Sequence, residues 1–488
     1  MIYIFHFLLL TVAITLIAPN HPLQTAFAFS LLGYLAVLKL IPRVSDSFIK
    51  IGLKGKDLSK PHQPTLPETM GLVSAITYLI LMIFLIPFVF FKYLVSFTND
   101  DALTSSTYQK QFAAISDNNL FPHNKLAEYL SAILCLQSTT LLGLFDDLFD
   151  IRWRHKFFLP AIASLPLLIV YYVDFSVTSV VIPPFLMKGW GSQIFLVINF
   201  FIDGVNRMVE GLSGLKFMTR ESTLITSPPL LDLGIFYYIY MSAISIFSPN
   251  SINILAGING LEVGQSIILA VILLLNDFCY LVSTSISQAA HDSHLFSAIF
   301  LIPFIGVSVA LLQYNWWPAR CFVGDTYCYF SGMVFAIVGI CGHFSKTLLI
   351  FLLPQIINFV YGLPQLFHVV PCPRHRMPRF NKTDGLMYPS YGSLDKPNKV
   401  SSGLLTILST LRLVDLQQEE GENKTTTLRF SNLTIINLTL VWLGPLREDT
   451  LCLVILVAQL LIGVSMIALR HTVGPWLFGY DNLSWGVK

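Results

Sequence analysis

The segment YLSAILCLQSTTLLGLFDDLFDIRWRHKFFLPAIASLPLLIVYYV occupies residues 129–173, and its pattern recurs along the chain. Two apolar runs, at 129–145 and 157–173, flank a short stretch of acidic, basic and aromatic residues. An apolar run of roughly 17 to 25 residues has the length of a transmembrane helix. The segment therefore predicts two membrane-spanning helices joined by a charged turn at the membrane surface.

The composition extends this prediction to the whole chain of 488 residues. Apolar residues make up 54% of it and charged residues 12%, and the mean hydropathy is +0.67. A soluble domain of this composition would expose a large apolar surface, so that class is excluded. The chain is expected to be an all-α polytopic membrane protein in a lipid bilayer. Ten spans are predicted, at 23–41, 70–91, 129–145, 157–173, 230–248, 265–283, 297–313, 327–341, 347–368 and 451–469.

The remaining segments define the expected domain organisation. Residues 1–22 are an apolar N-terminal extension, either an additional helix or a segment lying on the bilayer. Residues 23–370 form the transmembrane core, and 371–450 form a loop with a small α/β insertion between the last two helices. Residues 451–488 are the last span and its luminal tail. The seven cysteines are scattered and contain no CxxC pair, which indicates neither a disulfide framework nor a zinc site.

The distribution of basic residues predicts the orientation in the membrane. The connections after the odd-numbered spans lie on one face and carry most of the Lys and Arg residues outside the spans. By the positive-inside rule this face is cytosolic. The polar clusters of the chain fall on the same face: Lys56-Asp57 with Glu68, Asp146-Asp147 through Lys156, Asn253 to Glu262, Phe322 to Asp325, and Arg374-His375-Arg376.

The cluster from Asp146 to Lys156 points to a site for anions and cations together. Two adjacent carboxylates at a membrane edge repel each other and are costly to desolvate. A divalent metal with diphosphate, or Lys156, would neutralise them. The alternative is an ordinary basic loop with acidic balance.

Three of the other clusters also allow two interpretations. Asn253 and Asp325 offer oxygen atoms that suit Mg²⁺, although a glycine-containing helix-packing turn would explain the first of these segments. Phe322 can stack on a nucleobase, although a Gly-Asp-Thr turn such as the one that follows it is common in any loop. Arg374 and Arg376 can bind phosphate, with His375 as a further donor, or they can anchor anionic lipid head groups.

Four segments carry a family resemblance. LLGLFDDLFDIRWRHKFFLPAIASLPLLIVYY, NILAGINGLEVGQS, RCFVGDTYCYFSGMVFAIVGICGHFSKT and PQLFHVVPCPRHRMPRF closely resemble the eukaryotic UDP-N-acetylglucosamine:dolichyl-phosphate N-acetylglucosaminephosphotransferases, which are of the glycosyltransferase family 4 type. The resemblance runs from about Pro22 to the last span. It implies transfer of GlcNAc-1-phosphate from UDP-GlcNAc to dolichyl phosphate with release of UMP. This is the first step of dolichol-linked oligosaccharide synthesis for protein N-glycosylation, on the cytosolic face of the endoplasmic reticulum.

The resemblance also implies a role for each matching residue. Lys156 matches a residue at the phosphates in the catalytic site. The chemistry of the reaction adds Asp146 and Asp147 to that site and leaves open whether either is a base or only an electrostatic organiser. Asn253 and Asp325 match Mg²⁺ ligands. The expected nucleotide-sugar contacts are Lys56, Asp57, Leu58, Glu68, Asn259, Phe322, Arg374, His375 and Arg376. The expected lipid-phosphate contacts are Lys156, Ile246, Phe247, Asn250, Asn253 and Ile254. The family is dimeric, so a homodimer is expected, and no nucleic-acid partner is.

The chain departs from the family pattern in three places. Asp150 stands where the family has Asn, Lys56 stands where it has Gln, and an insertion occupies about 187–228. The insertion contains the apolar run Ile194 to Ile202, which is too short to span a bilayer, followed by sequence without clear periodicity. A lineage-specific luminal loop and a retained intron are both compatible with it.

Two other functions are alternatives. One is that of another prenyl-phosphate sugar-phosphate transferase. The other is that of a transporter, which should concentrate polar residues near the bilayer midplane.

Overall fold

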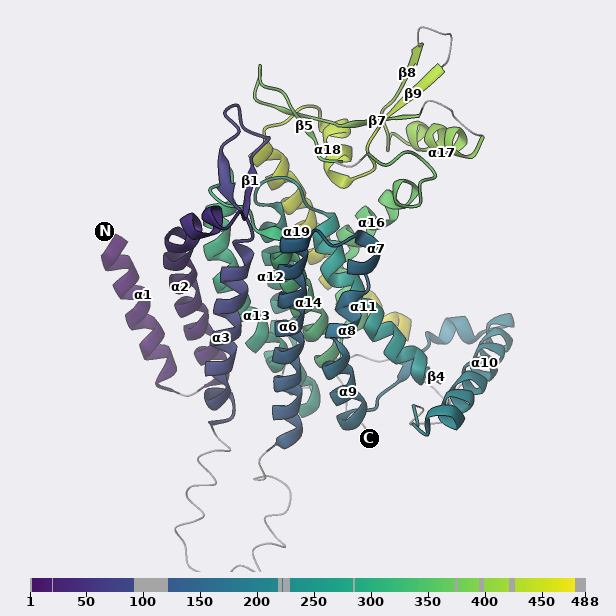
Figure 1. Ribbon diagram of the computed structural model, residues 1–488. Helices are drawn as coiled ribbons and strands as arrows, with labels where there is room; N and C mark the ends of the chain where they lie inside the picture. The colour runs from purple at the N-terminus through teal and green to yellow at the C-terminus, as the bar shows by residue number, and fades with distance from the viewer. Residues whose placement is uncertain are drawn as a thin grey trace, which may run out of the picture.

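The computed structural model describes residues 2–19, 21–91, 122–217, 222, 229–283, 286–373, 376–394, 399–420 and 426–478. Most of these residues form a bundle of long helices (Figure 1). The bundle helices are α1 (Ile2–Ile17), α2 (Pro22–Lys50), α3 (Gly71–Val89), α6 (His123–Phe149), α7 (Trp153–Lys156), α8 (Leu159–Ala163), α9 (Leu165–Asp174), α11 (Ile235–Ile254), α12 (Leu261–Leu281), α13 (Gln288–Asn315), α14 (Gly324–Cys341), α15 (Ser345–Phe351), α16 (Leu353–Leu366) and α19 (Glu448–Phe478). The luminal tail expected after the last span lies outside the described residues beyond 478.

The helices correspond to the predicted spans. In the described part of the chain, eight helices are long and apolar enough to cross a membrane, and the bent pair α15 and α16 makes a ninth. The remaining predicted span is α11, a 20-residue helix whose tyrosines and C-terminal Asn and Ser residues lower its hydropathy. Helices dominate because a backbone in lipid must satisfy its hydrogen bonds internally. The N-terminal extension forms helix α1 beside α2, and its 16 residues are short for a span.

Close helix packing around α14 brings the polar clusters together. Two glycines allow it. A Cβ at Gly143 of α6 would lie 2.7 Å from Cα of Thr326 in α14. A Cβ at Gly332 of α14 would lie 2.3 Å from Cα of Pro249 in α11. The central helix α14 is therefore held against both α6 and α11, the helices that carry Asp146 and Asn253.

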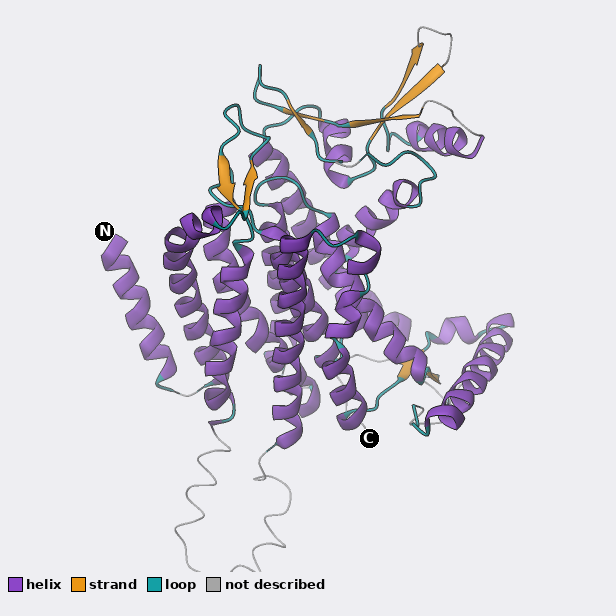
Figure 2. Ribbon diagram, viewed as in Figure 1, coloured by secondary structure: helices purple, strands orange, loops and turns teal. Residues whose placement is uncertain are grey.

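The strands form short antiparallel pairs, and most of them lie at one end of the bundle (Figure 2). In the first loop, β1 (Lys54–Lys56) pairs with β2 (Thr65–Pro67). In the insertion before the last helix, β5 (Arg379–Phe380) pairs with β6 (Met387–Tyr388), and β7 (Tyr391–Leu394), β9 (Thr426–Ser431) and β8 (Leu416–Glu420) form a three-stranded sheet in that order. Helices α17 (Lys399–Thr410) and α18 (Ile435–Leu443) complete this insertion. The predicted small α/β insertion is confirmed.

The connection between α9 and α11 differs from the sequence-based expectation. β3 (Ser179–Val181) pairs with β4 (Leu230–Asp232), and between them lie the 3-10 turn η1 (Pro184–Met187) and the 24-residue helix α10 (Trp190–Ser213). The expectation of no periodicity after Ile202 is wrong, because the helix continues for eleven more residues, to Ser213. The pattern is hidden because α10 exposes apolar residues such as Trp190 and Phe200 and buries Asn206. Residues 218–221 and 223–228 of the insertion lie outside the described part.

Candidate active site

The site begins where α6 ends against the start of α14. Asp147 accepts hydrogen bonds from the backbone N–H of Asp325 at 2.6 Å and from the N–H and hydroxyl of Thr326 at 3.1 and 2.6 Å. It thereby caps the N-terminus of α14, where backbone N–H groups lack helical partners and a negative charge is favourable. Gly324 has φ +74°, and a Cβ there would lie 2.5 Å from Asp147 Oδ2. Asp147 is therefore a residue that positions Asp325.

Asp146 faces a different set of groups. Lys156 Nζ lies 2.8 Å from Asp146 Oδ2 and 2.9 Å from Asp325 Oδ2, so one ammonium group bridges two carboxylates. The Asp146 side chain is 2% exposed, whereas the Asp325 side chain is 33% exposed. Asn253 Nδ2 donates to the other oxygen, Oδ1, of Asp325 at 2.9 Å. Four predicted residues from four separate segments thus meet at one point, with Asp325 open to solvent.

This cluster fits a magnesium ion. Mg²⁺ takes oxygen ligands and is usually held by one or two carboxylates together with water and substrate phosphates. Asp325 supplies an accessible carboxylate, and the Asn253 amide beside it can present its oxygen after rotation about its last bond. No group of three His, Cys, Asp or Glu residues that could hold a metal occurs among the described residues. An ion here would therefore complete its shell from amide, water and phosphate oxygens.

A second group of predicted residues surrounds Gly55 in strand β1. A Cβ at Gly55 would lie 3.1 Å from the ring of Phe322 and 3.4 Å from Glu68 Oε2. Backbone hydrogen bonds fix this arrangement, because Phe322 N–H donates to the Pro67 carbonyl and Met70 N–H donates to the Phe322 carbonyl. The pKa of Glu68 is raised above its usual value by burial, and by the negative charges of Asp147 and Asp325. Glu68, which lies beside Phe322, therefore senses the negative charges of the Asp325 cluster.

A cavity of about 420 Å³ opens between the first loop and the α/β insertion. Leu58 lines it from the first loop, Gly257 from the loop after α11, and Arg379 and Arg429 from the insertion. Arginines suit recognition of a negatively charged or polyhydroxylated ligand. Lys56 is exposed at the end of β1.

The last basic cluster is only partly described. Arg374 and His375 lie outside the described residues. The Nη1 of Arg376 lies 3.3 Å from the position of a Cβ at Gly362 in α16. Its backbone carbonyl accepts a hydrogen bond from Asn437 Nδ2 at 2.8 Å. Within the described part, no hydrogen bond or ion pair joins Arg376 to Lys156.

The predicted lipid-phosphate residues lie along the C-terminal half of α11. Asn250 Nδ2 donates to the carbonyls of Ile246 and Phe157, at 2.7 and 3.2 Å, so this amide ties α11 to the segment after Lys156. Ile246 and Ile254 are partly exposed. Phe247 packs edge-on against Phe359 of α16, with ring centroids 5.9 Å apart. The apolar surface of α11 therefore adjoins the Lys156 cluster.

Comparison with known proteins places the chain in a family. Residues 129–343 match Glycosyl transferase family 4. The chain is 52% identical to the UDP-N-acetylglucosamine–dolichyl-phosphate N-acetylglucosaminephosphotransferase of Saccharomyces cerevisiae over 96% of its own length and 95% of the relative. The chain belongs to this phosphotransferase family. The proteins of the same name from Schizosaccharomyces pombe and Dictyostelium discoideum are 45% and 36% identical, over 95% and 92% of this chain and 95% and 88% of theirs.

One departure from the family pattern has a local structural reason. Asp150 ends helix α6 with φ 46° and ψ 63°, in the left-handed region that Asn and Asp tolerate best among non-glycine residues. Its N–H donates to the Asp146 carbonyl, and its side chain is exposed. Asp and Asn therefore both suit this turn. The structure does not add Asp150 to the Lys156 cluster.

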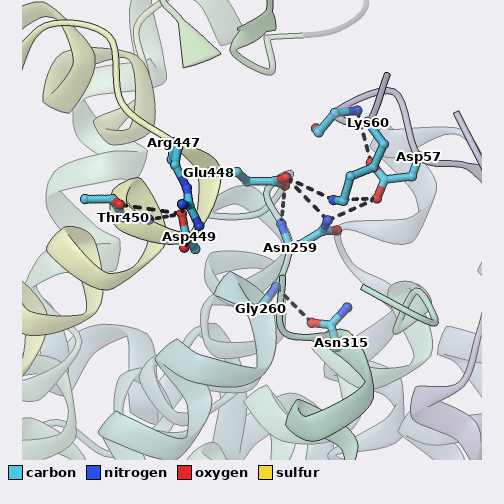
Figure 3. A network of polar contacts seen from close by, with 10 residues as sticks. Asp57, Lys60, Asn259, Gly260, Asn315, Arg447, Glu448, Asp449 and Thr450 are labelled. Atoms are coloured by element: carbon cyan, nitrogen blue, oxygen red, sulfur yellow. Dashed lines mark hydrogen bonds and ion pairs between the residues drawn. The ribbon is translucent and has the colours of Figure 1, made fainter. Parts of the chain in front are cut away.

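Glu448, the first residue of α19, was not predicted as a site residue. Its side chain is 3% exposed and reaches the loop before α12, where Glu448 Oε1 accepts from the Asn259 N–H at 2.8 Å (Figure 3). Lys60 Nζ contacts Glu448 at 3.4 Å and Asp57 at 2.9 Å. The only sequence signal was an acidic pair at the start of the last span. Such a pair is usually explained by the helix dipole alone.

Proposed function

We propose that this chain transfers GlcNAc-1-phosphate from UDP-GlcNAc to dolichyl phosphate, forming GlcNAc-diphosphate-dolichol and UMP. One observation carries the proposal: a relative that is named for this activity is 52% identical over nearly the full length of both chains. The site supports it independently, because cationic and carboxylate groups from distant segments meet beside a partly exposed apolar helix surface. Such a site suits a lipid that ends in a phosphate.

The reaction forms one phosphorus–oxygen bond and breaks another. An oxygen of dolichyl phosphate attacks the sugar-bearing phosphorus of UDP-GlcNAc, and the bond from that phosphorus to the bridging oxygen of UMP breaks. The attacking phosphate is already anionic at neutral pH, so no strong base is required. Lys156, placed between Asp146 and Asp325, offsets negative charge as the two substrates approach. Phosphoryl transfer depends mainly on such positioning and charge neutralisation.

In this proposal Asp325 and Asn253 would hold Mg²⁺, which when bound would neutralise phosphate oxygens. Asp147 contributes indirectly, because it orients the first turn of α14 and with it Asp325. Asp146 keeps Lys156 in place and charged. Asp146 is therefore an electrostatic organiser in this proposal, and neither carboxylate acts as a base.

The nucleotide-sugar would lie on the side of the site that faces strand β1. Phe322 would stack on the uracil, with Glu68 and Asn259 beside it. Lys56, Asp57 and Leu58 would follow the nucleotide along the first loop. Arg374, His375 and Arg376 would hold the diphosphate and the N-acetyl sugar. On the other side, Ile246, Phe247, Asn250 and Ile254 would line the path of the lipid phosphate towards Lys156.

The membrane setting follows the same proposal. The site faces the cytosol, because basic residues concentrate in the loops on its side of the bundle. The membrane is that of the endoplasmic reticulum, where dolichol-linked oligosaccharides begin. The protein acts as a homodimer, as its family does.

The experiment compares two carboxylate variants of the purified protein. UMP release is measured with UDP-GlcNAc, dolichyl phosphate and Mg²⁺ for the wild type, Asp325→Asn and Asp150→Asn. The wild type and Asp150→Asn are expected to release UMP at similar rates, and Asp325→Asn at a rate lower by at least a hundredfold. No release from the wild type would refute the function. Undiminished release from Asp325→Asn would refute the role of Asp325.

A further inference from the structure

Asn259 lies in a cage of charged side chains, Asp57, Lys60 and Glu448, that come from two distant parts of the chain. Asp57 belongs to the first loop, Asn259 to the loop between α11 and α12, and Glu448 to the start of α19 (Figure 3). Asn259 Nδ2 donates to Asp57 Oδ2 at 3.1 Å and to Glu448 Oε2 at 3.4 Å. Its backbone N–H donates to Glu448 Oε1 at 2.8 Å. Glu448 therefore holds both the backbone and the side chain of Asn259.

These contacts fix which way the Asn259 amide faces. A carboxylate only accepts hydrogen bonds, so the atom between Asp57 and Glu448 must be the NH₂ group of the amide. The carbonyl oxygen Oδ1 consequently points away from both carboxylates, as Figure 3 shows. Among the described residues, no donor bonds to this oxygen. The protein thus holds this acceptor in one orientation without pairing it to another described residue.

Lys60 pairs with both carboxylates. The side chains of Asp57 and Glu448 are each 3% exposed, and that of Lys60 is 13% exposed. Buried charges are retained in proteins when they are paired and hydrogen-bonded. Lys60 Nζ bonds to both carboxylates and lies 5.6 Å from the ring centre of Trp317. With both carboxylates paired to Lys60 and aimed at Asn259, the cage favours one amide orientation over the other.

We propose that Asp57 and Glu448 are positioning residues that hold Asn259 as an acceptor and thereby select uracil over cytosine. Uracil carries an N–H donor at N3, whereas cytosine carries an acceptor there. A fixed acceptor forms a hydrogen bond with the N3–H of uracil. With cytosine, the same acceptor faces another acceptor at N3, and no hydrogen bond forms. The inference rests on the proposed function, in which Asn259 contacts the base. A free amide could rotate and accept either base, so discrimination requires the cage.

The test compares UDP and CDP as competitors of UDP-GlcNAc in the UMP-release assay. The ratio of the two inhibition constants reports base selection. In the wild type UDP should bind about ten to a hundred times more tightly than CDP, the usual effect of one mispaired buried polar group. In Glu448→Gln the inhibition constant of UDP should rise and the ratio should fall about tenfold, with kcat little changed. Asp57→Asn, which weakens the other arm of the cage, should lower the ratio in the same direction.

The matched control is Asp449→Asn. Asp449 is the next residue along α19, but its carboxylate pairs with Arg447 instead of Asn259. The ratio of the UDP and CDP inhibition constants for Asp449→Asn should equal that of the wild type. A purely structural role of Glu448 would weaken UDP and CDP equally and leave the ratio unchanged, and that result in both cage variants would overturn the inference. Equal binding of UDP and CDP by the wild type would overturn it as well.

Two further measurements separate this inference from the proposed function. The double variant Glu448→Gln/Asn259→Ala should have the same ratio as Asn259→Ala alone, because Glu448 acts through Asn259. Additive losses would refute that coupling. If the wild type releases UMP but Asn259→Ala binds UDP normally, the assignment of Asn259 to the base fails while the transferase function stands. If the wild type releases no UMP, the function itself fails.

Discussion

Asp146 and Asp147 are adjacent in sequence, yet the structure gives them different tasks, and isosteric substitutions should separate these. Asp147→Asn puts an NH₂ group where one carboxylate oxygen now accepts hydrogen bonds from the first turn of α14. At least one charge-assisted hydrogen bond is lost, which costs about 1.5–3 kcal/mol. Loss of the negative charge at a helix N-terminus adds about 0.3–1 kcal/mol. The total expected loss of stability is therefore about 2–4 kcal/mol.

Asp146→Asn should cost much less. Lys156 keeps its contact with Asp325 at 2.9 Å, so no cation is left unpaired. The Asp146 carboxylate is 2% exposed, so an amide in its place removes a buried charge that is costly to desolvate, and the amide oxygen can still accept from Lys156; the net loss is about 1 kcal/mol. Thermal unfolding in detergent without added Mg²⁺, followed by tryptophan fluorescence, gives the unfolding midpoint of each variant and of the wild type. We expect wild type highest, Asp146→Asn slightly lower and Asp147→Asn lowest. A lower midpoint for Asp146→Asn than for Asp147→Asn would refute the assignment of Asp147 as the cap of α14.

Three other predictions concern separate parts of the molecule. Glu68→Gln should stabilise the protein at neutral pH. Because the pKa of Glu68 is raised on folding, the wild type loses stability as pH rises through that pKa. At acid pH, where Glu68 is protonated, the two proteins should have similar free energies of unfolding. A constant difference across the pH range would contradict this. Phe322→Ala should raise the KM for UDP-GlcNAc about 5- to 150-fold, since stacking is worth about 1–3 kcal/mol, whereas Phe322→Tyr should not. Asn206→Ala should lower stability by about 1–3 kcal/mol, because Asn206 Oδ1 accepts from the Ile235 N–H at the start of α11; the exposed neighbour Arg207→Ala should have no such effect.

The sequence was a good guide to the helices and to the Lys156 cluster. Long apolar runs predict spans because the bilayer leaves the backbone no alternative to helix, and polar residues at the ends of such runs are conspicuous. The difference between Asp146 and Asp147 was not predictable. Successive residues of a helix point about 100° apart, and only the packing of α6 against α14 decides which carboxylate meets the backbone of Thr326.

Contacts between distant segments account for the rest of what sequence analysis missed. Glu448 and Asn259 are 189 positions apart, and nothing local to either residue indicates the other. Helix α10 was missed for a different reason. Its outward side is apolar, and its buried Asn206 faces α11, the reverse of the pattern expected for a helix packed on a water-soluble core.

The central claim is that the sugar moves together with its phosphate, and one labelling measurement tests it directly. Purified protein is incubated with dolichyl phosphate, Mg²⁺ and UDP-GlcNAc that carries ³²P in the sugar-linked phosphate and ³H in the sugar. Both labels should enter the lipid phase in equal molar amounts, with unlabelled UMP left in the aqueous phase. Transfer of ³H alone, with ³²P-labelled UDP left in the aqueous phase, would contradict the account.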